Sequence, residues 1–291
     1  MTDKTKKRSF QDSIIGCIIL TLLTIISWMF LAIPFDYLIE PAKDVNSNLY
    51  TILDYAVKIY QIIPCLIFML IYIPDRPLLS KTLPGGGNNA KNALIGLAFG
   101  FVLNSTCVII SILTGDIHLY YSNPNWLYII LAFLAVFLQS YSEEFVCRLF
   151  LYQHLLRGYK DKPWVAMLIP SLIFAALHLL NPGTDAYSVI DSIVIGIVWS
   201  LMVYLFDSFW MACFYHTAWN FTQSILFGLP NSGLTYPLGV FKLESASAAK
   251  SFSYDPRYGV EGSLLALILD VTLMVVLIIM AVKKEEAKKS R

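Results

Sequence analysis

The sequence predicts an all-α, polytopic membrane protein with about eight transmembrane helices, and three observations lead to this prediction. Of the 291 residues, 57% are hydrophobic and only 14% are charged, whereas soluble domains carry about 25% charged residues. Apolar runs of roughly 20 residues, the length that crosses a bilayer, recur along the whole chain. The five cysteines are an odd number and lie mostly inside these runs. We therefore expect them to be buried free thiols and not a disulfide framework.

Eight apolar runs are the candidate spans, and turn-forming residues separate several of them. The spans are predicted at about 14–35, 54–73, 93–113, 126–151, 163–180, 187–206, 209–228 and 263–282. The first run follows a basic segment, but it is too long for a signal-peptide core. No small-x-small cleavage site follows it, so we expect it to be a retained span.

The chain divides into three predicted parts. Residues 1–125 hold the first three spans, residues 126–228 hold spans four to seven, and residues 229–291 hold an outer loop, the last span and a basic tail. The sequence contains no internal repeat and no segment that resembles a soluble domain. The candidate functional residues all lie in the middle part.

Lysine and arginine residues predict the topology, because cytoplasmic loops carry an excess of them. With eight spans, both termini and every second loop lie on one side of the membrane. That side receives Lys4, Lys6, Lys7, Arg8, Arg76, Lys81, Lys91, Arg157, Lys160, Lys162, Lys283, Lys284, Lys288, Lys289 and Arg291, and the other only Lys43, Lys242, Lys250 and Arg257. We therefore expect both termini in the cytoplasm. The short loops and the lack of an appended domain are typical of a bacterial plasma-membrane protein. The net charge of +1 gives no indication of a nucleic-acid partner.

The first polar cluster is Glu143-Glu144-x-x-x-Arg148, inside the fourth span. An ionised carboxylate at the bilayer centre costs at least about 2.5–3.5 kcal/mol, so such residues face a protein interior or a water-filled cavity. Glu144 and Arg148 are four residues apart on one helix face and can pair. Glu143 points about 100° away and remains available for chemistry. Withdrawn from water, a carboxylate becomes a stronger base.

Two further clusters lie in later spans. His178 is in the fifth span, four residues after Phe174, and His216 is in the seventh, four residues before Asn220. Phe174 is expected to pack beside the site. At 1.5 Å per residue, His178 lies at about the depth of Glu143, roughly 22–24 Å from the cytoplasmic helix ends. His216 lies only about 14 Å from the turn before its helix, so it reaches this depth only if that turn is recessed.

Gathered together, these groups suit hydrolysis by either of two routes. A carboxylate and an imidazole can deprotonate water while a second imidazole and an amide stabilise the oxyanion. Alternatively, Glu143, His178 and His216 can ligate a divalent metal such as zinc, which acidifies a bound water. The residues alone do not decide between the two, and the chain has no His-Glu-x-x-His motif.

The ordered set Glu-Glu-x-x-x-Arg, Phe-x-x-x-His and His-x-x-x-Asn resembles the CAAX protease and bacteriocin-processing family of intramembrane proteases. The matching residues are Glu143, Glu144, Arg148, Phe174, His178, His216 and Asn220, and the resemblance covers about residues 126–228. A common form of the motif has Phe-Arg-Gly after the glutamates. Here the Phe lies three residues before the Arg, and the Gly is absent. The functional positions are nevertheless intact.

The resemblance implies a membrane-embedded endopeptidase that acts on a peptide or protein with a membrane-associated tail. Glu143 would activate water with His178 beside it. His216 and Asn220 would steady the oxyanion or the water, and Glu144 and Arg148 would position the others. Family members are usually labelled metalloproteases, although a metal-free mechanism based on glutamate is also argued for them.

Two other functions compete with the peptidase. The same helices can serve a non-enzymatic immunity or scaffolding protein, in which the glutamates and Arg148 form only a structural charge network. A proton-coupled transporter can also use carboxylates and histidines. Transporters typically show repeated halves or paired broken helices, and the sequence has neither.

Overall fold

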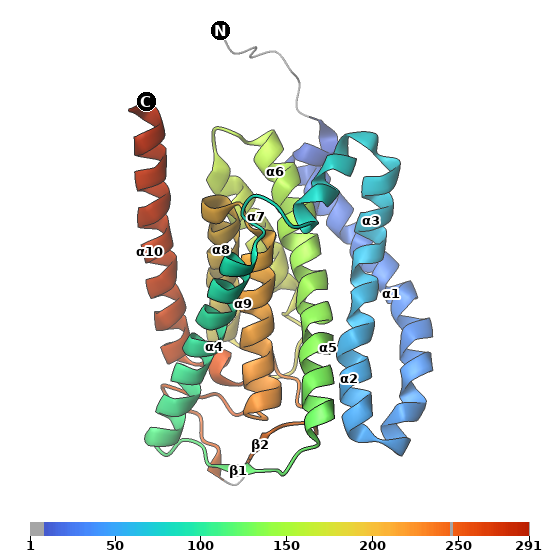
Figure 1. Ribbon diagram of the computed structural model, residues 1–291, viewed down its shortest axis with the longest axis vertical. Coiled ribbons are helices and arrows are strands. Elements are labelled where there is room, and N and C mark those ends of the chain that lie inside the picture. The colour runs from blue at the N-terminus through green and yellow to red at the C-terminus, as the bar shows by residue number, and fades with distance from the viewer. Residues whose placement is uncertain (1–8, 245–246, 291) are drawn as a thin grey trace.

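A computed structural model describes residues 9–244 and 247–290, which form a bundle of helices aligned with its long axis (Figure 1). The helices are α1 (Ile14–Val45), α2 (Ser47–Val57), α3 (Ile62–Ile71), α4 (Ala90–Leu113), α5 (Trp126–Glu144), α6 (Tyr152–Gly158), α7 (Pro163–Leu177), α8 (Ala186–Phe206), α9 (Phe209–Phe221) and α10 (Leu264–Lys289). Short 3-10 helices lie at Phe10–Asp12, Lys58–Gln61, Ile73–Thr82 and Val260–Gly262. Two strands, β1 (Leu119–Tyr121) and β2 (Phe241–Leu243), form an antiparallel ribbon at one end.

Six helical runs among the described residues are long and apolar enough to cross a membrane, which confirms the predicted all-α membrane fold. They are Ile14–Val45, Ser47–Ile71, Ala90–Leu113, Trp126–Gly158, Ala186–Phe206 and Leu264–Ala287. The two remaining runs lie where spans five and seven were predicted, but α7 has only 15 residues. α9 has 13 residues and continues as a π-helix over Thr222–Leu226. The count of eight spans therefore stays a prediction.

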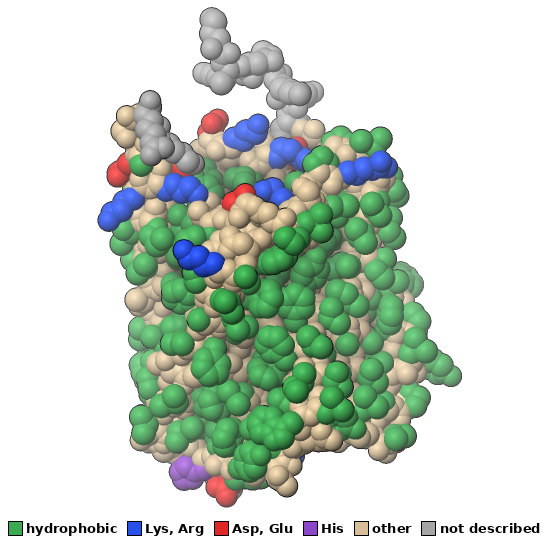
Figure 2. All heavy atoms as spheres, viewed as in Figure 1, with side chains coloured by type: hydrophobic (Ala, Val, Ile, Leu, Met, Phe, Trp, Pro, Cys, Tyr) green, Lys and Arg blue, Asp and Glu red, His purple; other side chains and the backbone are tan. Residues whose placement is uncertain are grey.

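Basic and apolar side chains occupy different levels along the bundle axis. On the face shown in Figure 2, hydrophobic side chains cover the middle and lysines and arginines gather near the upper end. Both ends of the described chain also lie there (Figure 1). Lys4, Lys6, Lys7, Arg8 and Arg291 lie outside the described residues. Which side of the membrane this end faces stays a prediction.

α4 and α9 are in close contact through two glycines spaced four residues apart. A Cβ added at Gly96 would collide with the carbonyl oxygen of Met211, and one at Gly100 with that of Tyr215. Small residues at this spacing let helix backbones approach closely in membranes. The contact places α9, which carries His216, against a helix from the predicted N-terminal part. The predicted three-part division is not tested by this packing and stays a prediction.

The turn between α8 and α9 is recessed, as the depth of His216 requires. Trp210 donates its indole N–H to the carbonyl of Thr82 at 2.9 Å, and its backbone N–H to Asn88 Oδ1 at 3.0 Å. Lys81 pairs with Asp207 at 3.1 Å. The segment from the 3-10 helix at Ile73–Thr82 to the start of α4 thus lies over this turn. In Figure 1 the end of α8 is correspondingly lower than α6.

The long segment between α9 and α10 folds back onto the bundle. It buries apolar side chains, including Leu238, Val240, Tyr254 and Val260. Its strand β2 pairs with β1 from the loop before α5, with Tyr121 opposite Phe241. The segment is therefore part of the wall around the interior. All five cysteines are buried and free, which confirms the prediction made for them.

Candidate active site

Glu144, Arg148 and His216 form a buried cluster between α5 and α9. One oxygen of Glu144, Oε1, accepts hydrogen bonds from Arg148 Nη1 at 3.1 Å and from His216 Nδ1 at 3.0 Å. Glu144 and Arg148 have no exposed side-chain surface. The Glu144–Arg148 pair follows from their spacing on one helix, whereas His216 approaches from a helix 72 residues away in sequence. The carboxylate therefore holds the imidazole in place.

Aromatic rings and one glycine hold Arg148. Its guanidinium carbon lies 4.9 Å from the ring centre of Trp199 and 5.2 Å from that of Phe174, within the range of cation–π attraction. Nη2 also donates to the carbonyl of Gly196 at 2.9 Å. A Cβ at Gly196 would lie 3.0 Å from that same Nη2 atom. α8 thus presents a glycine where the guanidinium needs room.

Glu143 is held by a chain of amide side chains. Gln139 Nε2 donates to Glu143 Oε1 at 2.6 Å, and Gln139 Oε1 accepts from Asn220 Nδ2 at 3.1 Å. Asn220 Oδ1 in turn accepts from Asn231 Nδ2 at 3.2 Å. All three bonds donate in the direction of Glu143, so the chain fixes the position of its carboxylate. The other oxygen, Oε2, is buried without a hydrogen bond and lies 3.7 Å from His216 Nε2.

The protonated nitrogens of both histidines follow from their partners. His178 Nδ1 lies 2.8 Å from the carbonyl oxygen of Phe174, which can only accept, so Nδ1 carries the proton. His216 Nδ1 faces the carboxylate that also pairs with Arg148, so it too carries a proton. In the neutral form of either ring, Nε2 then has a free lone pair. His216 is further fixed by stacking on Trp199, with ring centres 4.3 Å apart and planes 18° apart.

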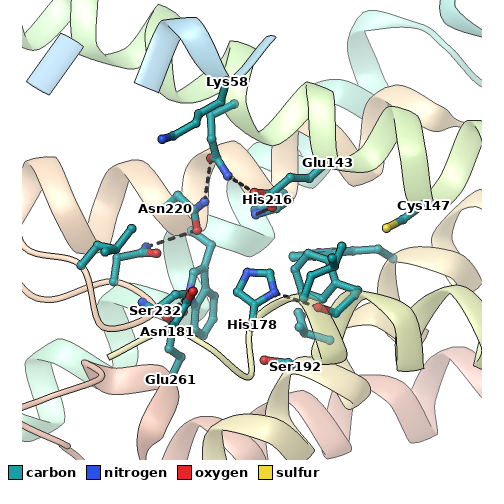
Figure 3. A pocket seen from close by; sticks show the side chains of 18 of the residues that line it. Lys58, Glu143, Cys147, His178, Asn181, Ser192, His216, Asn220, Ser232 and Glu261 are labelled. Atoms are coloured by element: carbon teal, nitrogen blue, oxygen red, sulfur yellow. Dashed lines mark hydrogen bonds and ion pairs between the residues drawn. The ribbon is translucent and has the colours of Figure 1, made fainter. Parts of the chain in front are cut away.

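A cavity of about 310 Å³ connects these groups, a volume within the range of small-molecule and peptide pockets. Glu143, His178, His216 and Asn220 line it, and Figure 3 shows them around one space. Glu144 and Arg148 lie behind its wall. Glu143 is near the middle of the helical run Trp126–Gly158, so the cavity reaches the interior of the bundle. The fold thus brings all six predicted site residues to one cavity or directly behind it.

The histidine beside Glu143 differs from the expected one. The resemblance implied that His178 lies beside Glu143, but the imidazole next to both glutamates is that of His216. His178 lies at the end of α7, half-buried and 4.4 Å from the Phe174 ring. Asn220, expected to face the oxyanion or water, has its amide in the chain to Glu143. These positions change which role each group can take.

Several lining residues had no assigned role in the sequence interpretation. Gln139 was detectable, because it lies four residues before Glu143 on the same helix face. Trp199, Asn231 and Glu261 come from other helices and from the outer segment, and no spacing pattern connects them to the glutamates. Glu261 accepts from Trp219 Nε1 at 3.0 Å and from Ser232 Oγ at 2.8 Å. Burial raises the pKa of the Glu261 carboxyl, and these hydrogen bonds only partly oppose that rise.

The residues present do not fit a metal centre. Within residues 9–244 and 247–290, no group of three or more His, Cys, Asp or Glu side chains has an arrangement that could hold a metal ion. The expected ligand set of Glu143, His178 and His216 does not form such a group. His216 uses Nδ1 for Glu144, so only Nε2 is available on the cavity side. We therefore derive no step through a metal.

Both helices that carry the glutamates and His216 continue as π-helices, and the first of these contains Arg148. The run that carries Glu143 and Glu144 becomes a π-helix at Phe145–Leu151, and α9 does so at Thr222–Leu226, just after Asn220. π-helical turns occur often at functional sites.

Comparison with known proteins adds one finding. Residues 124–222 match the model of a family described as type II CAAX prenyl endopeptidase Rce1-like. This range contains all six predicted site residues, together with Gln139 and Trp199. No curated protein and no solved structure matches the chain.

Proposed function

We propose that this chain, which through residues 124–222 belongs to the CAAX protease family, is an intramembrane endopeptidase that uses Glu143 to activate water. The observation that carries the proposal is the free Oε2 of Glu143, which lies 3.7 Å from His216 Nε2 on the wall of the cavity. Two polar atoms at that separation can both hydrogen bond one water at about 2.8 Å. The water would then lie inside the bundle.

In the first step, Glu143 removes a proton from this water, and the water oxygen forms a bond with the substrate carbonyl carbon. His216 orients the water through Nε2, and Glu144 with Arg148 keeps the imidazole from rotating. The carbonyl oxygen becomes an oxyanion. The side chains that can donate to it are the protonated imidazole of His178 and the second amide hydrogen of Asn220.

In the second step, the tetrahedral intermediate collapses and the C–N bond breaks. The proton taken up by Glu143 passes to the leaving nitrogen, which departs as an amine. Glu143 is thereby restored to its ionised form, stabilised by Gln139. The proton count is balanced without any further group.

The substrate class follows from where the cavity lies. A peptide must enter the bundle to reach Glu143, and a membrane-associated or lipidated segment is already concentrated at the bilayer. We therefore propose peptides or proteins with a membrane-associated tail as substrates, with the surrounding bilayer as the second partner.

Cleavage of a fluorogenic peptide library by the purified protein in detergent tests this function. Glu143→Gln keeps the side-chain volume but removes the base, so we expect kcat to fall by about 10²- to 10⁴-fold. Glu40→Gln is the matched control, because Glu40 is exposed on α1, 62% by side-chain area. Wild type and control should cleave alike.

A strong chelator, added in parallel, separates the two hydrolytic routes. Undiminished cleavage supports activation by the glutamate alone, whereas loss of activity that zinc restores would overturn the metal-free step. Full activity of Glu143→Gln on a substrate that wild type cleaves would overturn the role of Glu143. Cellular function retained by Glu143→Gln would instead favour an immunity or scaffolding role.

A further inference from the structure

Among the buried carboxylates of this cavity that have no part in the proposed hydrolysis, two have an oxygen that lacks a hydrogen-bond donor in the described part of the chain. Asp191 on α8 is 4% exposed and Asp270 on α10 is fully buried, and both line the cavity. Among the described residues, Asp191 Oδ1 and Asp270 Oδ2 have no hydrogen-bond partner. Asp270 Oδ1 accepts a long hydrogen bond of 3.4 Å from the Tyr215 hydroxyl. A buried oxygen without a partner is costly, so these two atoms indicate a missing donor.

Both carboxylates are close to the catalytic centre: Asp270 contacts Tyr215, the neighbour of His216, and Asp191 is on the same helix as Trp199. Asp191 and Trp199 are eight residues apart on one face of α8, which corresponds to about 12 Å, and Trp199 stacks on His216. An extended peptide advances about 3.4 Å per residue. A long side chain within about three residues of the scissile bond therefore reaches Asp191.

The charge balance of the cavity favours a cation in this region. Of the residues that the structure describes, four carboxylates line it, those of Glu143, Asp191, Asp270 and Glu261, against one lysine, Lys58. Lys58 already pairs with Asp54 at 3.3 Å. Figure 3 shows Glu261 and Ser192, the neighbour of Asp191, on the side of His178 away from Glu143 and Lys58. The negative charge thus forms a separate region next to the catalytic groups.

Aromatic faces line the same region. Trp199 and Trp219 are both on the cavity wall. The Trp199 ring is already in contact with His216 and Arg148, so the Trp219 ring is the one that can attract an organic cation. The indole N–H of Trp199 is a further buried donor without a partner, which a substrate carbonyl would satisfy. Because no metal-holding group of side chains occurs among the described residues, an organic cation fits better than a bare metal ion.

We propose that Asp191 and Asp270 form a subsite for the ammonium or guanidinium group of a lysine or arginine in the substrate, within about three residues of the cleaved bond. This inference rests on the proposed peptidase function and names its substrate preference. The basic side chain donates to the two unpartnered carboxylate oxygens.

The test compares peptides that carry a single lysine with otherwise identical peptides that carry norleucine at the same position. Lysine is scanned through the three positions on each side of the bond that wild type cleaves. We expect wild type to cleave the best lysine peptide at least about tenfold faster in kcat/KM, the effect of one hydrogen bond to a charged group. In Asp191→Asn this ratio falls to about one.

Asp270→Asn repeats the measurement at the partner carboxylate, in case Asp191→Asn does not fold. Asp44→Asn is the matched control, because Asp44 is exposed on α1. A wild-type ratio near one at every position overturns the inference while leaving the peptidase intact. The inference is also overturned if both variants lose activity equally on the two peptides, so that the lysine-to-norleucine ratio of kcat/KM is the same as in wild type.

A binding measurement keeps the inference testable if no peptide is cleaved. Tryptophan fluorescence of Glu143→Gln, titrated with the lysine and norleucine peptides, reports occupancy of a cavity lined by Trp199 and Trp219. We expect at least about tenfold tighter binding of the lysine peptide, lost in Glu143→Gln/Asp191→Asn. Equal binding of the two peptides, or no binding of either, counts against the subsite, whereas lost catalysis alone counts only against the peptidase.

Discussion

A single carboxylate oxygen organises the charged cluster. Glu144 Oε1 accepts from both Arg148 and His216, and Oε2 accepts from no group in the described part of the chain. The charges of Glu144 and Arg148 compensate each other, so the pair can be buried completely. The imidazole of His216 is held by the oxygen that the arginine has already fixed. The two groups behind the wall therefore set the direction of the Nε2 atom that faces Glu143.

The amide chain makes Gln139 a positioning residue. Gln139→Leu removes the donor to Glu143 Oε1 and the acceptor for Asn220 together. Because a hydrogen bond to a charged group contributes about 1.5–3 kcal/mol, we expect kcat to fall about 10- to 100-fold with KM little changed. Steady-state kinetics on a cleaved peptide give both constants.

Gln153→Leu is the control for this change. Gln153 is on the same helical run and is also buried, but it does not line the catalytic cavity. A purely structural role of Gln139 would raise KM or lower the yield of folded protein in proportion to the activity loss. Either result would contradict the positioning role.

At the scale of helices, the α4–α9 contact fixes how deep His216 and Asn220 lie. Gly96 and Gly100 meet carbonyl oxygens of α9 and not flexible side chains. Backbone atoms cannot rotate away, so an added methyl group moves the whole helix. The α8–α9 turn, held by Trp210, prevents α9 from sliding along its axis to compensate.

Gly100→Ala tests this contact. The new Cβ would collide with the Tyr215 carbonyl, and we expect the unfolding free energy to decrease by about 1–3 kcal/mol, as for overpacked cores. Peptidase activity should fall as well, because Tyr215 adjoins His216. Unfolding in detergent, followed by tryptophan fluorescence, measures the first effect.

Ala98→Val on the exposed side of the same helix provides the comparison. It adds two methyl groups where nothing is packed, so its stability should equal that of wild type. Equal stability of Gly100→Ala and wild type would show that α4 and α9 can separate without cost.

At the scale of the whole molecule, a charged network ties together segments distant in sequence. Arg157 on α6 pairs with Asp12 and with Asp75, each at 2.7 Å. His154 lies 3.2 Å from each of the same two carboxylates. The 3-10 helix at Phe10–Asp12, the 3-10 helix at Ile73–Thr82 and α6 are thereby joined at the end of the bundle where the described chain begins and ends.

The pH dependence of stability follows from Asp12. Burial would raise the pKa of this carboxyl, but hydrogen bonds from His154 and Arg157 outweigh it and hold the pKa below its ordinary value of 3.8. The folded state then binds fewer protons than the unfolded state. Stability from Asp12 is therefore fully present above pH 3.8 and is lost as the pH falls through the lower folded pKa.

Asp12→Asn should accordingly lower the unfolding free energy at pH 7 by about 2–3 kcal/mol. This is less than for a fully buried pair, because the Arg157 side chain is 31% exposed. Thermal unfolding in detergent between pH 7 and pH 3 measures this effect. The difference in unfolding temperature between Asp12→Asn and wild type should become smaller toward pH 3. Asp161→Asn, an exposed change in the α6–α7 turn, is the control and should unfold at the same temperature as wild type. A constant gap for Asp12→Asn would exclude the ionisation of Asp12 as its cause.

The sequence by itself determined the all-α membrane fold and the interactions within one helix. Apolar run length and helical period are local properties, so they place the helices and pair Glu144 with Arg148. They also place His216 and Asn220 on one face. The same period could have identified Gln139 beside Glu143.

The tertiary structure alone decided which groups from different helices meet. It placed His216 and not His178 against the glutamates, brought Asn231 and Glu261 in from the outer segment, and put Asp191 and Asp270 on the same cavity wall. The physical reason is that rotation and depth of a helix depend on close packing between backbones. Contacts such as Gly100 against Tyr215 and the recessed α8–α9 turn set that packing, and they join residues far apart in the chain.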